Sequence, residues 1–112
     1  MAVRLLDTTP RWVEIDGSRF HIRSLDAEER ARALETQTTD TGEIRMNLGV
    51  YNLRVVEFGL LDWENVEDAS GNPVEFSKEK IKLLPTDVLT KLANEILGIS
   101  TLSTEEEQEL RG

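Results

Sequence analysis

Residues 44–61, IRMNLGVYNLRVVEFGLL, form the longest apolar stretch of the chain, and the fold depends on how they pack. At about 100° per residue, one apolar stripe runs along one side of a helix and a second runs along the opposite side. The first stripe contains Ile44, Leu48, Tyr51, Val55 and Phe58, and the second contains Met46, Val50, Leu53 and Leu60. A surface helix needs one apolar stripe, so two stripes predict a central helix about 27 Å long with neighbours on both sides.

The composition indicates one small domain. The 112 residues are 38% apolar and 31% charged, which allows a core to form while much of the surface stays in water. We expect residues 1–102 to form a single domain and residues 103–112, STEEEQELRG, to form an acidic tail that frays or is disordered. The chain shows no signal peptide and no apolar run long enough to span a membrane, so we expect a cytoplasmic protein without a membrane partner.

Charge and cysteine content exclude several classes of function. The chain has 22 acidic and 13 basic residues, which gives a net charge of −9. This charge opposes binding to a phosphate backbone, so nucleic acid is not an expected partner. The chain has no cysteine, which excludes disulfides and thiolate metal sites. We expect neither a metal nor another cofactor.

A β-hairpin is predicted within residues 11–25. Asp16-Gly17 is typical of a two-residue type I′ turn, in which both central residues adopt positive φ. This turn pairs Ile15 with Ser18 and Val13 with Phe20, which places alternate apolar residues on one face. His21 is the only histidine and is expected to be a solvated strand residue beside Trp12, on the polar face.

A short helix is predicted after the hairpin. Asp26 can cap the first free amides, and Glu29 stands at the capping-box position. The apolar stripe of this helix is narrow, since it consists of Ala27, Ala31 and Leu34. We therefore expect a peripheral helix, followed by a loop at residues 36–42 that precedes the central helix.

Acidic residues gather in residues 62–68, after the central stretch. Four carboxylates suggest a calcium site, but Val66 and Ala69 interrupt the alternating oxygen ligands that an EF-hand loop requires. The favoured interpretation is a solvated loop, with Val66, Val74 and Phe76 packed back onto the core.

Two helices are predicted near the C-terminus. Ser77 is expected to cap a short helix with Ile81 and Leu84 pointing inward, and Leu84-Pro85 forces a break. The next helix has an apolar arc of Val88, Leu89, Leu92, Ala93 and Ile96, and Gly98 is expected to end it. Together these elements predict an α+β fold, mostly α, in which an N-terminal β-hairpin packs on a small helical bundle with a long central helix.

Several motifs occur together in an order that resembles the tail assembly chaperones of long-tailed bacteriophages. They are RFHIRSL at residues 19–25, an acidic helix, GLLDWENV at residues 59–66, DASGNPVEFS at residues 68–77, Leu84-Pro85 and the amphipathic helix. The resemblance implies a phage or prophage protein of the host cytoplasm that binds and solubilises the tape-measure protein during tail morphogenesis. It further implies self-association, and the major tail protein is an additional candidate partner.

The resemblance leads us to expect a non-catalytic protein that binds its client through apolar residues near Trp63 and the C-terminal helix. Trp63, Leu92 and Ile96 are the predicted partner-binding residues. The alternative for Trp63 is a core position, where its ring anchors the acidic loop against Phe76. Two other functions stay open: an acidic decoy that mimics DNA, and a small enzyme subunit, for which the sequence shows no convergent catalytic group.

Overall fold

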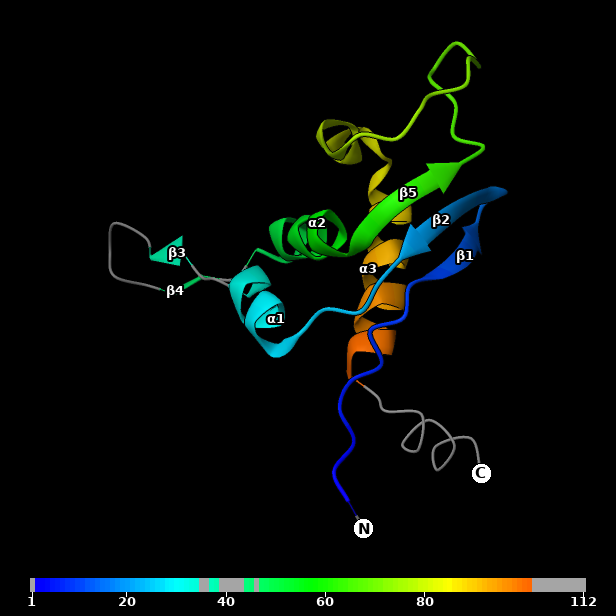
Figure 1. Cartoon of the computed structure of the whole chain (residues 1–112). Coiled ribbons are helices and arrows are strands. Elements are labelled where there is room, and N and C mark those ends of the chain that lie inside the picture. Colours follow the sequence, from blue (N-terminus) through cyan, green and yellow to red (C-terminus); the bar gives the residue numbers. More distant parts are fainter. Residues whose placement is uncertain (1, 35–36, 39–43, 46, 102–112) are drawn as a thin grey trace.

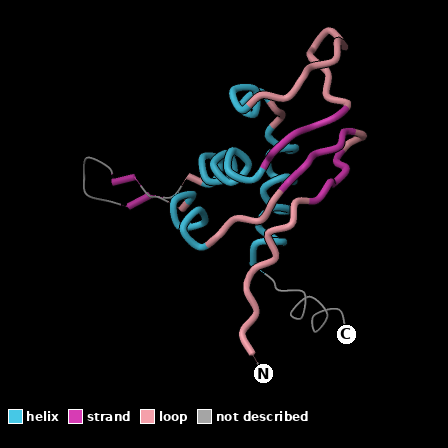
Figure 2. Tube along the Cα trace, viewed as in Figure 1, coloured by secondary structure: helices cyan, strands magenta, loops and turns pink. Residues whose placement is uncertain are grey.

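A computed structural model describes residues 2–34, 37–38, 44–45 and 47–101 of the chain (Figure 1). It shows an α+β fold, as predicted, in which a three-stranded antiparallel sheet packs beside helices. The sheet has the order β1-β2-β5, and Figure 2 shows that β1 and β2 are joined directly, whereas helices lie between β2 and β5 along the chain. The elements are β1 (Arg11–Ile15), β2 (Ser18–Ile22), α1 (Ala27–Ala33), β3 (Gln37–Thr38), β4 (Ile44–Arg45), α2 (Leu48–Gly59), β5 (Leu60–Glu64), the 3-10 helix η1 (Lys78–Leu83) and α3 (Thr86–Thr101).

The predicted hairpin is confirmed in both its turn and its register. Asp16 and Gly17 have φ values of 51° and 85°, which is the backbone that a type I′ turn requires. Val13 pairs with Phe20, and Ile15 pairs with Ser18. The apolar face of the hairpin therefore points into the core, where Phe20 is fully buried.

The sheet has a third strand that was not predicted, because its first two residues were assigned to the central helix and residues 62–64 to the acidic loop. Leu60 and Leu61 begin β5, which pairs with β2 through Phe20 and Trp63. Apolar residues suit a buried strand as well as a buried helix, so the composition of this stretch does not separate the two. The prediction of one helix through residue 61 is therefore wrong at its C-terminal end.

The central helix is also shorter at its N-terminal end. The side-chain oxygen of Asn47 accepts a hydrogen bond from the Val50 amide, which caps α2 at this point. Ile44 belongs to β4 and not to α2. Leu48 and Val50 are exposed, so the first turn of α2 has only a weak apolar stripe. The helix is nevertheless central, because it contacts α1, η1 and α3.

Helix α3 forms the floor on which both α2 and the sheet rest (Figure 1). Its arc of Leu92, Ala93 and Ile96 is completely buried, as the amphipathic pattern predicts. The helix continues through Gly98 to Thr101, so the predicted end at Gly98 is wrong. Near its C-terminus, the buried Ser100 hydroxyl accepts a hydrogen bond from the Leu25 amide at 2.7 Å and thereby ties α3 to the segment before α1.

Gly59 of α2 packs directly against the Ile96 side chain of α3. A Cβ atom on this residue would lie 2.7 Å from Cγ2 of Ile96, which is shorter than a van der Waals contact. Ile96 is itself fully buried and has little room to move. The contact between the two helices therefore requires glycine at position 59.

Helix α1 has the predicted capping box of Asp26 and Glu29. Its predicted apolar stripe is wrong, because Ala27 and Ala31 are exposed, Leu34 is 45% exposed, and the helix residue that reaches the core is Ala33. This helix is only seven residues long, and its orientation is set by the capped N-terminus and by an ion pair with the sheet.

Two predictions fall largely or wholly outside the described residues, namely the loop at residues 36–42 and the acidic tail at residues 103–112. Of the loop, only the short strand β3 is described. The predicted short helix after Ser77 is present as the 3-10 helix η1, with Ile81 buried. Within the part of the chain that the structure describes, no helix combines the length and the apolar character needed to cross a bilayer.

We predict that Gly59→Ala destabilises the protein by about 1–3 kcal/mol, because the added methyl group overpacks the contact with Ile96. Gly98→Ala is the matched control, since it lies in a helix with open space around the Cβ position. That substitution should stabilise by up to about 1 kcal/mol through helix propensity. Chemical denaturation of both variants measures the difference, and equal effects would contradict the close packing at Gly59.

A second prediction concerns the ion pair that joins the end of β2 to α1. The Arg23 guanidinium donates two hydrogen bonds to the Glu29 carboxylate, at 2.9 and 2.6 Å. These bonds hold the pKa of Glu29 below its usual value of 4.5. A lowered pKa in the folded state stabilises the protein above pH 4.5, and this contribution is lost as the pH falls through the folded-state pKa.

Glu29→Gln should therefore lower the free energy of unfolding at neutral pH by about 1–2 kcal/mol and flatten its decrease on the acid side. Glu28→Gln is the control, because Glu28 pairs with Arg32 at the surface. This substitution should change the free energy of unfolding little. Denaturation curves from neutral to acid pH test this, and identical pH profiles for Glu29→Gln and the unmodified chain would rule out the stabilising role.

Candidate functional site

Trp63, near the end of β5, lies at the centre of a candidate binding region. Its side chain is only 6% exposed, and its indole Nε1 donates a hydrogen bond to the carbonyl of Val74 at 2.8 Å. The edge of its ring meets Phe76 at a centroid distance of 5.1 Å and an angle of 83°. The alternative interpretation of Trp63, a core residue that anchors the following loop against Phe76, is therefore confirmed.

The loop between Trp63 and Phe76 is an ordered turn. The Asp68 carboxylate accepts the amides of Ser70 and Asn72, at 2.9 and 3.0 Å, and Gly71 adopts a φ of 85°. The amide of Val74 donates to the carbonyl of Val66 at 2.8 Å, which closes the turn as a small hairpin. The DASGNPVEFS motif is thus explained by local backbone chemistry.

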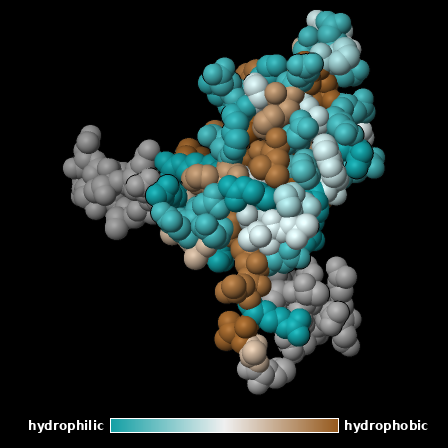
Figure 3. Space-filling view, in the orientation of Figure 1, coloured by the Kyte–Doolittle hydropathy of each residue, from teal (hydrophilic) through white to brown (hydrophobic). Residues whose placement is uncertain are grey.

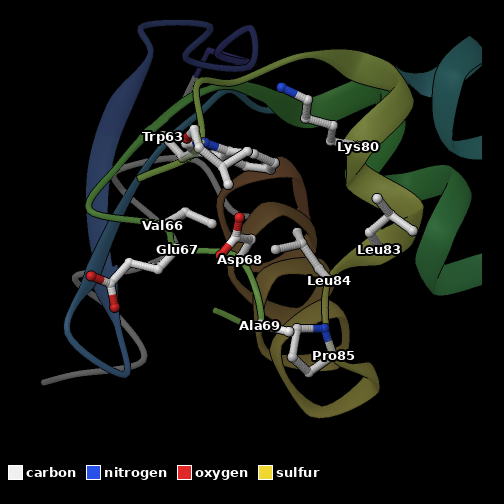
Figure 4. A pocket seen from close by; sticks show the side chains of 10 residues that line it. Trp63, Val66, Glu67, Asp68, Ala69, Lys80, Leu83, Leu84 and Pro85 are labelled. Carbon is white, nitrogen blue, oxygen red and sulfur yellow. The ribbon is translucent and has the colours of Figure 1, made fainter. Parts of the chain in front are cut away.

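A groove opens between this turn and the junction of η1 with α3 (Figure 4). Its volume is about 430 Å³, within the range of sites that hold small ligands or a few side chains of a partner. Figure 4 shows Val66 and Glu67 of the turn on one side, Leu83 and Leu84 on the other, and Trp63 at the upper edge. The apolar residues of the groove include Trp63, Val66, Val74, Leu83, Leu84 and Pro85.

Charged groups border the groove on both sides. Glu67 and Asp68 belong to the turn, and Lys80 belongs to η1. Backbone amides, above all that of Asn72, donate hydrogen bonds to the Asp68 carboxylate. These bonds lower the pKa of the Asp68 carboxyl group, so this side chain is ionised at neutral pH. The Lys80 amine donates to the carbonyl of Glu75 at 3.1 Å. The side of the groove formed by the turn is therefore acidic.

Leu83 is the most exposed apolar residue of the groove. It is 77% exposed, although its neighbour Leu84 is half-buried and Ile81 is fully buried. The 3-10 helix has three residues per turn, so Ile81 and Leu84 share the inward side and Leu83 is left outside. A large aliphatic side chain in this position favours contact with a partner.

The structure places the three predicted partner-binding residues in the core. Leu92 and Ile96 are fully buried between α3, α2 and the sheet, and Trp63 is nearly so. Their predicted location on an exposed surface must be corrected, because the amphipathic arc that suggested a binding face is used for the floor of the fold. Of the three, only Trp63 lines the groove.

Sequence reasoning missed Leu83 and Pro85 as surface residues. The available signal was the pair Leu83-Leu84 directly before a proline, since two adjacent side chains of a short helix cannot both point inward. The sequence predicted that Ile81 and Leu84 point inward, and the structure confirms this, since Ile81 is buried and Leu84 is half-buried. What it did not single out is the exposed Leu83 between them.

The remaining candidates have structural roles. The ring of His21 stacks on Trp12 at a centroid distance of 4.6 Å, as expected for a cross-strand pair on the polar face. Glu64 pairs with Arg19 at 3.0 Å, and Asp62 accepts the amide of Trp63 at 2.8 Å. Among the described residues, no three acidic or histidine side chains converge in a way that could hold a metal ion.

Comparison with known proteins gives one family. Residues 15–112 match the family model described as YdaY prophage protein. The match includes β2, β5, the turn and the groove, and it begins at the last residue of β1. No curated protein and no solved structure matches the chain significantly.

We predict that Trp63→Ala lowers the free energy of unfolding by about 3–5 kcal/mol, because it removes a buried ring and leaves the Val74 carbonyl without its donor. Trp12→Ala is the control, since Trp12 is only half-buried on the outer face of the hairpin. This substitution should lower the free energy of unfolding by less. Urea denaturation measures both values. A larger loss for Trp12→Ala would contradict the anchoring role of Trp63.

Proposed function

The chain belongs to the YdaY prophage protein family, and on this premise we propose that it is a non-catalytic tail assembly chaperone. In this proposal it binds the tape-measure protein of its phage in the host cytoplasm and keeps that client soluble during tail morphogenesis. The observation that supports the proposal most directly is the open apolar groove beside Trp63, with Leu83 exposed at its edge.

The groove has the features that an extended apolar client requires. Leucine, valine and tryptophan supply apolar contact area, and the fixed turn gives the groove one rigid wall. The net charge of −9 keeps the complex soluble after the apolar surfaces of the client are covered. The motifs of residues 59–66 and 68–77 that resemble tail assembly chaperones build this same region.

The alternative of an acidic DNA mimic has less support. Such a protein needs carboxylates arranged along an exposed face to imitate phosphates. Here several carboxylates have local partners: Asp68 holds its turn, Glu64 pairs with Arg19, and Glu29 pairs with Arg23. The acidic residues therefore serve the fold at these positions, which favours a chaperone with a solvated acidic surface.

The test is co-expression of the full chain with the tape-measure protein encoded by the same prophage. We expect the soluble fraction of the client to increase and the two proteins to purify together. Leu83→Asp should reduce the amount of client recovered by about tenfold, because it places a charge at the apolar edge. The protein should still fold, since Leu83 is 77% exposed.

Leu48→Asp is the matched control for this experiment. Leu48 is also an exposed leucine, at 61%, but it lies at the start of α2 and not in the groove. Acidic residues are tolerated at a helix N-terminus, so this variant should bind the client normally. The proposal is refuted if the client is equally soluble without the chain and the two proteins never co-purify.

A further inference from the structure

The N-terminal segment carries exposed apolar side chains. Val3 is 94% exposed and Leu5 is 92% exposed, whereas Leu6 is half-buried. Figure 3 shows apolar surface at the lower edge of the molecule, over the segment where the chain begins in Figure 1. We refer to residues 2–6 as the arm.

The arm has a defined starting point on the body of the protein. The buried Ser24 hydroxyl donates a hydrogen bond to the carbonyl of Asp7 at 2.9 Å, which fixes the chain where it leaves the fold. Residues 2–10 form neither helix nor strand. In an extended segment, side chains two residues apart point to the same side, so Val3 and Leu5 can enter one groove together.

The arm and the groove are complementary in character. The arm residues, AVRLL, include one base, Arg4, and no acid. The groove is apolar and has Glu67 and Asp68 on the side formed by the turn. An apolar segment without carboxylates therefore matches the lining of the groove and is not repelled by its acidic side.

The arm cannot reach the groove of its own chain. Five residues span at most about 18 Å, and the arm leaves the body at the end opposite to the turn of residues 66–74 (Figure 1). The chain as a whole, arm included, extends 53 Å along its longest axis. A groove that receives an arm must therefore belong to another copy of the chain.

We propose that the arm of one copy docks in the groove of a second copy, with Val3 and Leu5 packed among Trp63, Leu83 and Pro85. Because the two contact surfaces differ, the interface joins unlike faces and leaves a free groove at one end and a free arm at the other. Copies can then be added head to tail, and the series does not stop at a dimer.

Sedimentation velocity of the full chain, from low micromolar to submillimolar concentration, tests this arrangement. The unmodified protein should sediment faster as its concentration rises, without a plateau at the dimer. Leu5→Asp removes a working arm and Leu83→Asp removes a working groove, so each should raise the apparent dissociation constant by at least about tenfold. Both side chains are exposed, and circular dichroism checks that each variant is folded.

Mixing the two variants provides the decisive result. Leu5→Asp keeps an intact groove, and Leu83→Asp keeps an intact arm, so an equal mixture should form dimers and nothing larger. Leu48→Asp serves as the control and should associate like the unmodified chain. The proposal is overturned if the unmodified chain is monomeric throughout, if the mixture forms no dimer, or if Leu48→Asp is the only variant that prevents association.

A consequence for the client rests on the proposed function: arm and tape-measure protein would compete for the same groove. Leu5→Asp should then capture at least as much client as the unmodified chain, whereas Leu83→Asp should bind neither the client nor a second copy. A failure of the chaperone function can be told apart from a failure of the arm proposal. If the copies associate through the arm but no variant captures the client, only the chaperone function is refuted. If the protein is strictly monomeric but captures the client through Leu83, only the arm proposal is refuted.

Discussion

The missing side chain of Gly59 is the constraint on which the arrangement of the elements depends. At this residue α2 ends and β5 begins, with no connecting loop. The Gly59 carbonyl accepts a hydrogen bond from the Arg23 amide at 2.9 Å, and its Cα lies against Ile96 of α3. One residue thus holds the helix, the third strand and the floor in contact, because only glycine permits this approach of backbone to side chain.

The motifs that resemble tail assembly chaperones describe a scaffold and not a contact surface. Trp63, Asp68, Gly71 and Phe76 fix the shape of the turn through backbone hydrogen bonds and ring packing. The side chain best placed to contact a partner, Leu83, lies outside both motifs. The residues that fix the turn are therefore separate from the exposed residue beside it, so the turn can keep its shape when Leu83 is replaced.

Local chemistry was predictable from the sequence, and long-range pairing was not. Asp16-Gly17 determines its hairpin register because the turn type depends on these two residues alone. The end of α2 depends on β2, which pairs with Leu60 from almost forty positions earlier in the chain. The burial of the α3 arc was uncertain for a similar reason: an apolar arc can pack in the core or form a binding face, and only the position of α2 and the sheet against α3 separates these outcomes.

The floor helix α3 also determines when folding can finish. It is the last described element of the chain, yet the buried bond between Leu25 and Ser100 joins residues 75 positions apart. The hairpin can form as soon as it leaves the ribosome, whereas the core lacks one side until residues 86–101 have been made. A nascent chain at that stage exposes the apolar faces of the sheet and of α2, and its folding competes with aggregation until synthesis is complete.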